Sequence, residues 1–565
     1  MNKIIVASVL CIWLIQNNPG KSLRGIMIKS GNETISEWWG NTPSLRYIRS
    51  LKARSVRHCG VGLPRFTHND KKPKPNKLTR SRIFSYNKDT NESSEQAILL
   101  HESCGVFGIY SPGEDVARLT FFGLFALQHR GQESAGIATS DGKRIQLFAD
   151  MGLVSQVFDE TALSQLTGHI SIGHNRYSTT GSSKSINVQP LLIGQGNDCF
   201  ALAHNGNIVN SSHLFRELTD QGYQFRTSTD SEVIGHLILS SPSTDPVDKI
   251  RYAMHRLQGA YSLTLMTRNT LYAVRDPWGV RPLCLGKMNG GWVVASETCA
   301  LDHIGATLVR EIEPGEIVSI DENGVKSFRE PVQRRALCIF EFIYFARPDS
   351  IINGKLLYPT RQAMGANLAR EYPVKADLVM GVPDSATAAG LGYAHESQIS
   401  YSEGLLKNRY VGRTFIAPDQ RIRDLGVKLK FNPLPQMLEG KRVVVVDDSI
   451  VRGTTTPKVV ALLRRAGAKE VHMRICAPPI RYPCFFGVDM ATRRELIAAH
   501  KSVAQIREFI GADTLGYLSL PGLIKSVDLP ENIFCTACFT GDYPIPVQLE
   551  MDKLALENAF AGPDE

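Results

Sequence analysis

The chain of 565 residues is too long for one hydrophobic core, and its length suggests about three or four domains. A hydrophobic content of 43% and a charged content of 21% are ordinary for a globular protein. The net charge of +9 comes from residues 1–90, which hold 17 Lys or Arg against 4 Asp or Glu, whereas the remainder holds 47 against 51. The main part of the chain therefore gives no electrostatic reason to expect nucleic-acid binding.

Residues 1–103 form a basic leader. An apolar run over 4–15 resembles a signal-peptide core and is short for a membrane span, and the rest of the leader has little apolar periodicity, which argues for disorder. Three interpretations stay open: an organelle transit peptide, a start codon assigned too early, and a secretory signal, which the need for reduced thiols disfavours. We expect a cytoplasmic protein that binds no membrane, or a plastid-stroma protein if the leader is a transit peptide.

Residues 104–335 have the pattern of short strands punctuated by glycine. Strand patterns lie at 105–110, 170–174 and 199–203, and an apolar segment of helical length covers 119–129. This region is predicted to be an α/β domain dominated by sheet.

The pattern changes over residues 336–500. Apolar runs at 376–382 and 441–446 have strand length, end in polar loops and lead into helical patterns, the second over 459–466. Continuous Val runs predict strands buried on both faces, as in a parallel sheet. Residues 501–565 are predicted to be a tail that is helical in places and carries a Cys pair.

The most specific motif is Val-Val-Val-Val-Asp-Asp-Ser-Ile-Val-Arg-Gly-Thr-Thr-Thr at 443–456. A buried strand delivers Asp447 and Asp448 to its carboxyl end, where ligands bind in open α/β sheets. The next loop opens a helix, and its N–H groups and hydroxyls suit a terminal phosphate. The two acids suit ribose hydroxyls, with or without Mg²⁺. The alternative is an Asp-rich strand end with a helix cap.

A basic segment runs from Lys407 to Lys430, between the two apolar runs. It is either a solvated surface or a mobile lid over pyrophosphate. We favour the lid, because an activated ribose would otherwise be hydrolysed by water.

Cys104 heads a Cys-Gly-Val-Phe-Gly-Ile strand, which alone is uninformative. Polar segments at 128–136, 173–179, 204–207 and 228–232 follow in that order. Together they resemble the N-terminal-nucleophile (Ntn) glutaminase domain of the amidotransferases. In that family the Cys becomes the first residue and its free α-amine acts as the base, so that whatever precedes Cys104 would be removed.

The resemblance to the glutaminases implies a role for each of five residues. Cys104 attacks the glutamine carboxamide, Arg176 pairs with the substrate carboxylate, and Asp230 receives the substrate α-amino group. The side chain of Asn205 and the N–H of Gly206 form the oxyanion hole.

The 443–456 motif resembles the phosphoribosyl-pyrophosphate (PRPP) signature of type I phosphoribosyltransferases. By that resemblance Asp447 and Asp448 bind the ribose side and one Mg²⁺, to which Ser385 in the pyrophosphate loop at 381–385 adds an oxygen. The predicted PRPP-binding residues are Asp447, Asp448, Ser449, Arg452, Gly453, Thr454, Thr455, Thr456, Lys407 and Arg409.

Glutaminase and phosphoribosyltransferase on one chain resemble the amidophosphoribosyltransferase family over 101–544. The resemblance implies a four-layer αββα Ntn-hydrolase domain followed by a doubly wound parallel-sheet phosphoribosyltransferase domain. It implies that glutamine, PRPP and water give 5-phosphoribosylamine, pyrophosphate and glutamate, the first step of purine synthesis, with ammonia channelled between the sites. It also implies a homo-oligomer with purine-nucleotide inhibitors.

Two rival functions are disfavoured by the motifs. A non-catalytic PRPP or nucleotide sensor is disfavoured by the intact set of Cys104, Arg176, Asn205 and Asp230. Glutamine–fructose-6-phosphate amidotransferase shares the glutaminase half, but its sugar isomerase half has no use for the 443–456 motif.

The eleven cysteines are sparse for this length and indicate thiols in a reducing compartment. Cys535 and Cys538 form a CxxC pair, compatible alone with a redox motif, a zinc half-site or nothing, and no second pair completes a zinc site. In the iron–sulfur branch of the family, Cys338, Cys484 and this pair hold a [4Fe–4S] cluster. The resemblance therefore implies one structural cluster per subunit.

Overall fold

The computed structural model describes residues 104–177, 184–332, 334–408, 431–488, 492–547 and 556, and two short strands near the N-terminus. These strands, β1 (Lys29–Ser30) and β2 (Glu33–Thr34), pair antiparallel. The chain divides into two units, 1–92 and 93–565, and the leader outside β1 and β2 lies beyond the described residues. Within the described ranges, no helix combines the length and the apolarity that crossing a membrane requires.

Two antiparallel sheets make up the first half of the larger unit. In spatial order, the seven-stranded sheet consists of β13 (Thr307–Glu311), β11 (Cys284–Met288), β12 (Gly291–Ala295), β3 (Gly105–Tyr110), β6 (Ile170–Arg176), β4 (Ser134–Ser140) and β5 (Ile145–Met151). The six-stranded sheet consists of β15 (Gly324–Arg329), β14 (Glu316–Asp321), β10 (Leu271–Arg275), β9 (Gly259–Met266), β8 (Phe200–Ile208) and β7 (Leu191–Ile193).

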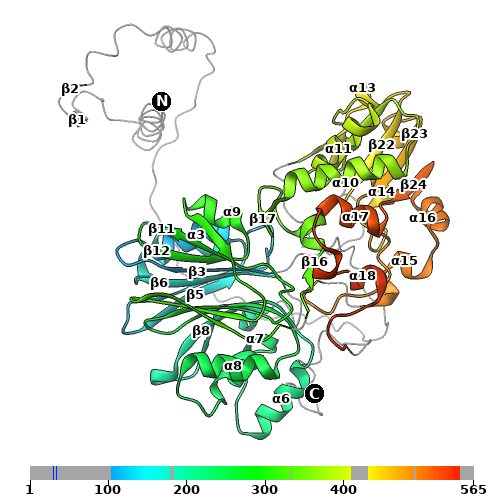
Figure 1. Cartoon of the computed structure of the whole chain (residues 1–565). Coiled ribbons are helices and arrows are strands. Elements are labelled where there is room, and N and C mark those ends of the chain that lie inside the picture. The colour runs from blue at the N-terminus through cyan, green and yellow to red at the C-terminus, as the bar shows by residue number, and fades with distance from the viewer. Residues whose placement is uncertain are drawn as a thin grey trace, which may run out of the picture. The chain divides into compact units, whose positions relative to one another are not determined.

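The two sheets pack face to face, and helices cover their outer faces (Figure 1). Alternate side chains of β3 point to opposite faces of its sheet, so one set contacts the other sheet and the other set contacts the helices. Val106 faces the core between the sheets, whereas Phe107 and Ile109 face the helices. On the seven-stranded sheet lie α3 (Val116–Ala126), α4 (Val154–Val157), α5 (Glu160–Gln165) and α9 (Thr298–His303). On the six-stranded sheet lie α6 (Ser211–Asp220), α7 (Asp230–Leu239) and α8 (Pro246–Arg256). The four-layer αββα prediction is confirmed.

The second half is built on a four-stranded parallel sheet. Its order is β19 (Leu378–Gly381), β22 (Arg442–Asp447), β23 (Glu470–Ile475) and β24 (Thr514–Tyr517). Helices α10 (Leu357–Glu371) and α11 (Thr387–Ser397) cover one face, and α14 (Thr456–Arg465) and α16 (Val503–Ile510) cover the other. The sheet extends beyond residue 500, since β24 pairs with β23.

The Val run in β22 is buried on both sides of this sheet, as predicted. Val444 and Val446 join the core under α10 and α11, and Val443 and Val445 join the core under α14. All four side chains are fully buried. Burial of a Val side chain contributes at least roughly 1.5 kcal/mol, so the run favours a central strand strongly.

The tail returns to the junction of the two halves. Helix α17 (Leu520–Val527) packs on α10, and β25 (Phe534–Cys535) pairs in parallel with β16 (Leu337–Cys338). Short elements complete the chain: η2 (Ser185–Asn187), η3 (Gly196–Asp198), the π-helical turn η4 (Glu341–Phe345), β17 (Ile351–Ile352), β18 (Lys355–Leu356), β20 (Leu405–Lys407), β21 (Phe431–Pro433), α13 (Pro435–Leu438), η5 (Arg493–Glu495), α15 (Ile497–His500), η6 (Glu531–Ile533) and α18 (Ala537–Thr540).

Two elements run further than their sequence patterns indicate. β8 continues through the polar residues 204–207, because each of them has a ladder partner on β9. α14 begins at Thr456, where Pro457 suits the first helical turn.

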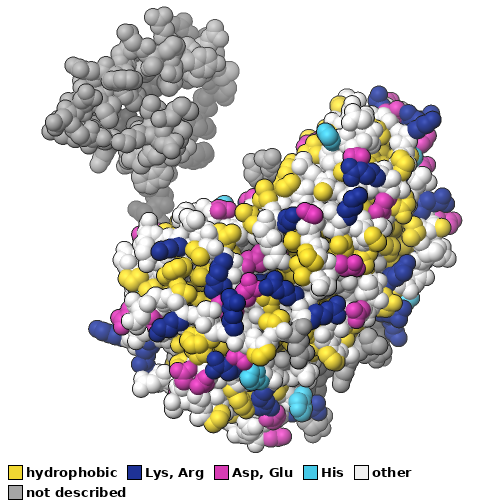
Figure 2. Space-filling view, viewed as in Figure 1, with side chains coloured by type: hydrophobic (Ala, Val, Ile, Leu, Met, Phe, Trp, Pro, Cys, Tyr) yellow, Lys and Arg dark blue, Asp and Glu magenta, His cyan; other side chains and the backbone are white. Residues whose placement is uncertain are grey.

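Charges of both signs are interspersed on the face of the larger unit shown in Figure 2. Lys and Arg side chains lie among Asp and Glu there, in keeping with the near balance of charge beyond residue 90.

Candidate active sites

The thiol of Cys104 lies at the start of β3, in the seven-stranded sheet. It donates a hydrogen bond to the Tyr177 carbonyl at 3.2 Å and accepts one from the Tyr177 N–H at 3.3 Å. Burial raises its pKa to about 11, although the Tyr177 bond and the Arg176 charge act in the opposite direction. Such a thiol is protonated at neutral pH and needs a base before it can attack.

A small cavity of about 10 Å³ adjoins this thiol. Its lining residues are Cys104, Arg176, Tyr177, Gln189, His204, Gly206, Thr229, Asp230 and Ser231. A space of that size holds about one water molecule, so a glutamine substrate requires the pocket to open. Residues 178–183, which follow Tyr177, lie outside the described part of the chain.

Opposite charges lie in the wall of this cavity. The Arg176 side chain, at the end of β6, is 2% exposed, and Asp230, the first residue of α7, is 4% exposed. Asp230 accepts a hydrogen bond from the Ile208 N–H at 3.0 Å, and its other oxygen lies 3.7 Å from Nδ1 of His204. A buried guanidinium and a buried carboxylate suit the two charged ends of an amino acid.

Asn205 and Gly206 lie in β8 beside the cavity. Asn205 is fully buried, and neither its Oδ1 nor its Nδ2 has a hydrogen-bond partner among the described residues. A side chain at Gly206 would bring its Cβ to 1.9 Å from the Ala260 carbonyl oxygen, so only glycine fits. A buried amide without a partner is costly, and a ligand oxygen would satisfy it.

Among the remaining polar side chains that line the pocket, those of Gln189, His204 and Ser231 contact one another, and the sequence analysis gave them no role. His204 Nδ1 lies 3.2 Å from the Ser231 hydroxyl, which also accepts a hydrogen bond from the Gln189 amide at 3.0 Å. His204 was noted only as part of a motif. Gln189 lies outside every predicted segment, and its place in the site comes from the packing of β8 against α7.

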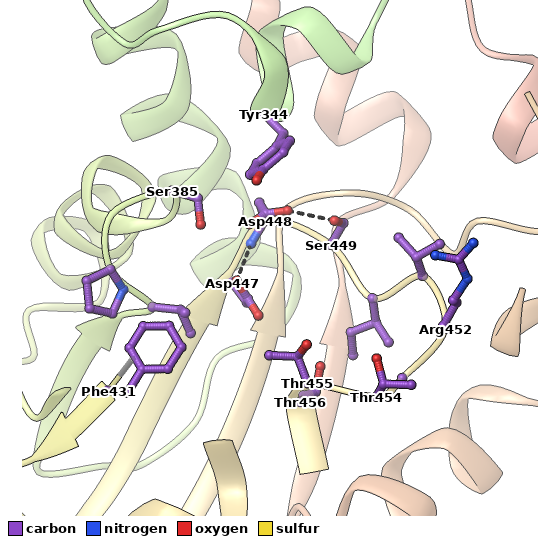
Figure 3. Close-up of a pocket in the computed structure, with 15 residues that line it drawn as sticks. Tyr344, Ser385, Phe431, Asp447, Asp448, Ser449, Arg452, Thr454, Thr455 and Thr456 are labelled. Atoms are coloured by element: carbon purple, nitrogen blue, oxygen red, sulfur yellow. Dashed lines mark hydrogen bonds between the residues drawn. The ribbon is translucent and has the colours of Figure 1, made fainter. Parts of the chain in front are cut away.

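A second cavity, of about 100 Å³, lies at the carboxyl end of the parallel sheet (Figure 3). It is lined by Tyr344, Val382, Pro383, Ser385, Phe431 and all residues from Asp447 to Thr456. Strand β22 ends at Asp447, and the 448–455 loop leads into α14, as the motif predicted. The structure therefore brings together Ser385 and the whole predicted phosphate loop.

The acids and hydroxyls of this cavity converge. The Asp448 N–H donates to the Asp447 carboxylate at 3.0 Å, and the Ser449 hydroxyl donates to the Asp448 carboxylate at 2.6 Å. In Figure 3 the hydroxyl groups of Thr455 and Thr456 lie across the cavity from Ser385. These side chains offer oxygen atoms to a cation or a sugar, and the amino end of α14 offers N–H groups to a phosphate.

Tyr344 is the unexpected member of this cavity. It belongs to the turn η4, close to the domain junction, and its hydroxyl lies toward Asp448 in Figure 3. The sequence analysis did not assign it to the PRPP site.

Of the three predicted cationic ligands of PRPP, two are paired with carboxylates in the structure and one lies outside the described residues. Arg452 forms an ion pair with Glu495, and Lys407 forms one with Asp384 at 2.5 Å. Arg409 lies outside the described residues, as does the predicted Lys407–Lys430 lid from residue 409 onward.

The four predicted cluster cysteines lie near one another. β16 places Cys338 opposite Cys535. Burial raises the pKa of Cys538 well above its ordinary value, and the nearby Cys535, Cys338 and Cys484 raise it further. Burial likewise raises the pKa of Cys338 to about 12. Across the described ranges, no three His, Cys, Asp or Glu side chains are arranged to hold a metal ion.

Comparisons with known proteins identify the family of the chain. Residues 174–303 match the family described as "Glutamine amidotransferase domain". An amidophosphoribosyltransferase of Mycobacterium tuberculosis is 50% identical over 478 residues, which cover 82% of this chain and 90% of that protein. "Amidophosphoribosyltransferase 1, chloroplastic" of Arabidopsis thaliana is 49% identical over 485 residues, which cover 85% of each chain.

A solved structure is similar over the same region. The glutamine phosphoribosylpyrophosphate amidotransferase of B. subtilis, complexed with ADP and GMP, superposes with a TM-score of 0.76 at 47% identity. The match covers 80% of this chain and 100% of that chain.

Proposed function

This chain belongs to the amidophosphoribosyltransferase family, which catalyses the first step of purine biosynthesis, and we propose which of its residues carry each half of that reaction. The observation that supports the assignment is the presence, in one compact unit, of a buried thiol pocket and a phosphate cavity. The first serves glutamine and the second serves PRPP.

In the glutaminase half, Cys104 is the nucleophile. Its raised pKa means that a base must take the thiol proton, and removal of residues 1–103 would free an α-amine on Cys104 itself for that purpose. Arg176 and Asp230 bind the carboxylate and the ammonium group of glutamine. The buried Nδ2 of Asn205, together with the Gly206 N–H, stabilises the oxyanion that forms when sulfur attacks the carboxamide carbon.

In the transferase half, the loop from Arg452 to Thr456 binds the 5-phosphate of PRPP. Asp447 and Asp448, which line the cavity, hold the ribose hydroxyls. Lys407 and Arg409 bind PRPP as well, as the resemblance implies. Ammonia released at Cys104 attacks C1 of the ribose, and pyrophosphate leaves. Because ammonia is released at one site and consumed at the other, it must travel between the two sites without reaching solvent. Tyr344 lies at the junction and in the cavity wall, so it is positioned to border this path.

One Mg²⁺ fits the oxygen atoms of Asp447, Asp448 and Ser385. Magnesium prefers carboxylates, water and phosphate oxygens, and this cavity offers oxygen atoms from two carboxylates and several hydroxyls. When bound, the ion neutralises charge that develops on the departing pyrophosphate. The carboxylates also orient the ribose through its hydroxyl groups.

Cys338, Cys484, Cys535 and Cys538 would hold a [4Fe–4S] cluster, as in the iron–sulfur branch of the family. Burial raises the pKa of the Cys338, Cys535 and Cys538 thiols, and the neighbouring thiols raise it further, so thiolates there are costly unless a positive group compensates for their charge. The iron of such a cluster would compensate for that charge, with the four thiolates as its ligands. Its role would be structural, since it would tie β25 and the tail to β16.

Protein purified without oxygen is expected to be brown and to contain about four irons per chain. Iron analysis and the visible absorption spectrum measure this directly. The Cys535→Ser variant, in which one thiolate is lost, should contain far less iron than a Cys284→Ser control, because Cys284 lies in β11. Colourless protein with stoichiometric zinc would refute the cluster.

For regulation, we propose that purine nucleotides inhibit this protein and that it forms a homo-oligomer. The structure of the B. subtilis enzyme complexed with ADP and GMP supports purine nucleotides as ligands. A cytoplasmic location remains our prediction. The alternative is the plastid stroma, which the chloroplastic relative in Arabidopsis supports.

The reaction itself has a stoichiometric test. With glutamine, PRPP and Mg²⁺, the purified protein should release glutamate and pyrophosphate in equal amounts, and omission of glutamine should stop pyrophosphate release unless ammonia is added. Both products are measured by coupled assays. Glutamate release with no pyrophosphate under any condition would refute the transferase assignment.

A further inference from the structure

Four fully buried charges meet where η4 approaches the seven-stranded sheet. Arg130, Arg281, Glu297 and Glu341 are all inaccessible to solvent. Buried charges are costly unless each has a partner of opposite sign, and here two guanidinium groups are paired with two carboxylates. Glu341 is the member that both arginines share.

One arm of this cluster reaches the proposed nucleophile. Arg130 binds Glu341 through both terminal nitrogens, at 2.7 and 3.1 Å, and its Nε donates to the Cys104 carbonyl at 3.2 Å. The guanidinium therefore holds the backbone of the residue whose sulfur attacks glutamine. Its orientation is set by the bidentate bond to Glu341.

The other arm reaches the proposed oxyanion hole. Arg281 donates to Glu341 at 3.3 Å, and its Nε and Nη2 donate to the Phe486 carbonyl at 3.0 and 2.7 Å. The next residue, Gly487, lies so close to Gly206 that a Cβ on Gly487 would be 3.0–3.1 Å from the Gly206 backbone. The amide of Asn207 also donates to the Phe485 carbonyl at 2.9 Å. The 485–487 segment therefore packs against β8 at the proposed oxyanion hole.

We propose that Glu341 is a positioning residue for glutamine hydrolysis, acting through Arg130 on Cys104 and through Arg281 on β8 at Gly206. The inference rests on the proposed roles of Cys104 and Gly206. Glu341 touches no substrate, and it fixes the distance between the attacking sulfur and the oxyanion donors. A carboxylate is needed because two guanidinium groups require acceptors, whereas a Gln at this position would turn an N–H donor toward one of them.

The positioning role predicts a change in kcat rather than in KM. Arg176 and Asp230, which are proposed to bind the ends of glutamine, contact other groups, Glu133 at 3.9 Å and the Ile208 N–H at 3.0 Å, so the KM for glutamine should change little. In Glu341→Gln and in Arg281→Gln, kcat for glutamine-dependent synthesis should fall about 10²-fold, the usual cost of a displaced oxyanion donor. Ammonia-dependent synthesis by the same preparations should stay within about twofold, because it does not use Cys104.

Two further measurements separate positioning from loss of structure. An electrophilic glutamine analogue should still label one thiol per chain in each variant, which shows that the pocket is intact. Arg474→Gln is the matched control. Arg474 is also a buried arginine that donates to backbone carbonyls, those of Tyr372 and Met473, but it lies in β23, away from both arms. It should keep the wild-type kcat.

The outcomes are distinct. If Glu341→Gln does not fold, Arg281→Gln decides the matter, since it leaves the Arg130–Glu341 pair in place. Unchanged kcat in the folded variants would overturn the positioning role, and so would equal losses with glutamine and ammonia or a loss of labelling. Glutamine-dependent activity that survives Cys104→Ala would instead refute the proposed function on which the inference rests.

Discussion

Cys104→Ala is expected to abolish glutamine-dependent synthesis of phosphoribosylamine and to leave ammonia-dependent synthesis intact. Among the described residues that line the glutamine pocket, Cys104 alone carries sulfur, so the rate with glutamine should fall by a factor on the order of 10⁴ or more, as for other lost nucleophiles. The PRPP cavity belongs to the parallel sheet in the other half of the unit, and ammonia supplied in solution bypasses the glutaminase. Both rates are measured by pyrophosphate release.

Cys284→Ala is the matched control for this substitution. Cys284 is also a buried thiol of the seven-stranded sheet, but its Sγ donates to the Ala295 carbonyl away from the pocket. It should keep both activities. N-terminal sequencing of active wild-type protein should begin at Cys104, since the free α-amine is the proposed base. Equal loss of both activities in Cys104→Ala would show that the two halves have been assigned to the wrong reactions.

The parallel sheet and its ligand loop were predictable because the information is local. Four consecutive Val residues indicate a strand buried on both faces, and acids at its end, followed by Gly and three Thr, indicate a phosphate loop. The structure confirms the strand as β22 and groups Ser385 with the loop in one cavity. For the glutaminase the local pattern alone was weak, and the order of several segments was needed to interpret Cys104.

Other parts of the sites depend on contacts between distant segments, which no local pattern encodes. Arg130 and Glu341 are 211 positions apart, and nothing around either residue indicates that they pair in the interior. Tyr344 reaches the PRPP cavity only because η4 turns toward the parallel sheet. The arrangement of Gln189 with Ser231 likewise depends on the packing of α7 against β8.

Asp447→Asn and Asp448→Asn are expected to lower PRPP-dependent turnover on the order of 10²-fold, with either glutamine or ammonia as the nitrogen source. Each change removes one negative charge from the cavity that would hold the ribose and Mg²⁺. Glutamine hydrolysis without PRPP should change little, because the carboxylates serve only the transferase half. Asp377→Asn is the control, since Asp377 pairs with Arg442 at the opposite end of the same sheet.

PRPP is also expected to raise the wild-type rate of glutamine hydrolysis, and the Asp447 and Asp448 variants should lose this increase. The glutamine pocket described here holds about one water molecule, so it must open and reorder when glutamine binds. PRPP can drive that change only if it binds the activated form more tightly than the resting form. The physical route would run from the cavity through Tyr344 and η4 to the junction at 346–350. Steady-state glutaminase rates with and without PRPP decide the matter, and a wild-type rate indifferent to PRPP would reject the coupling while both active sites stand.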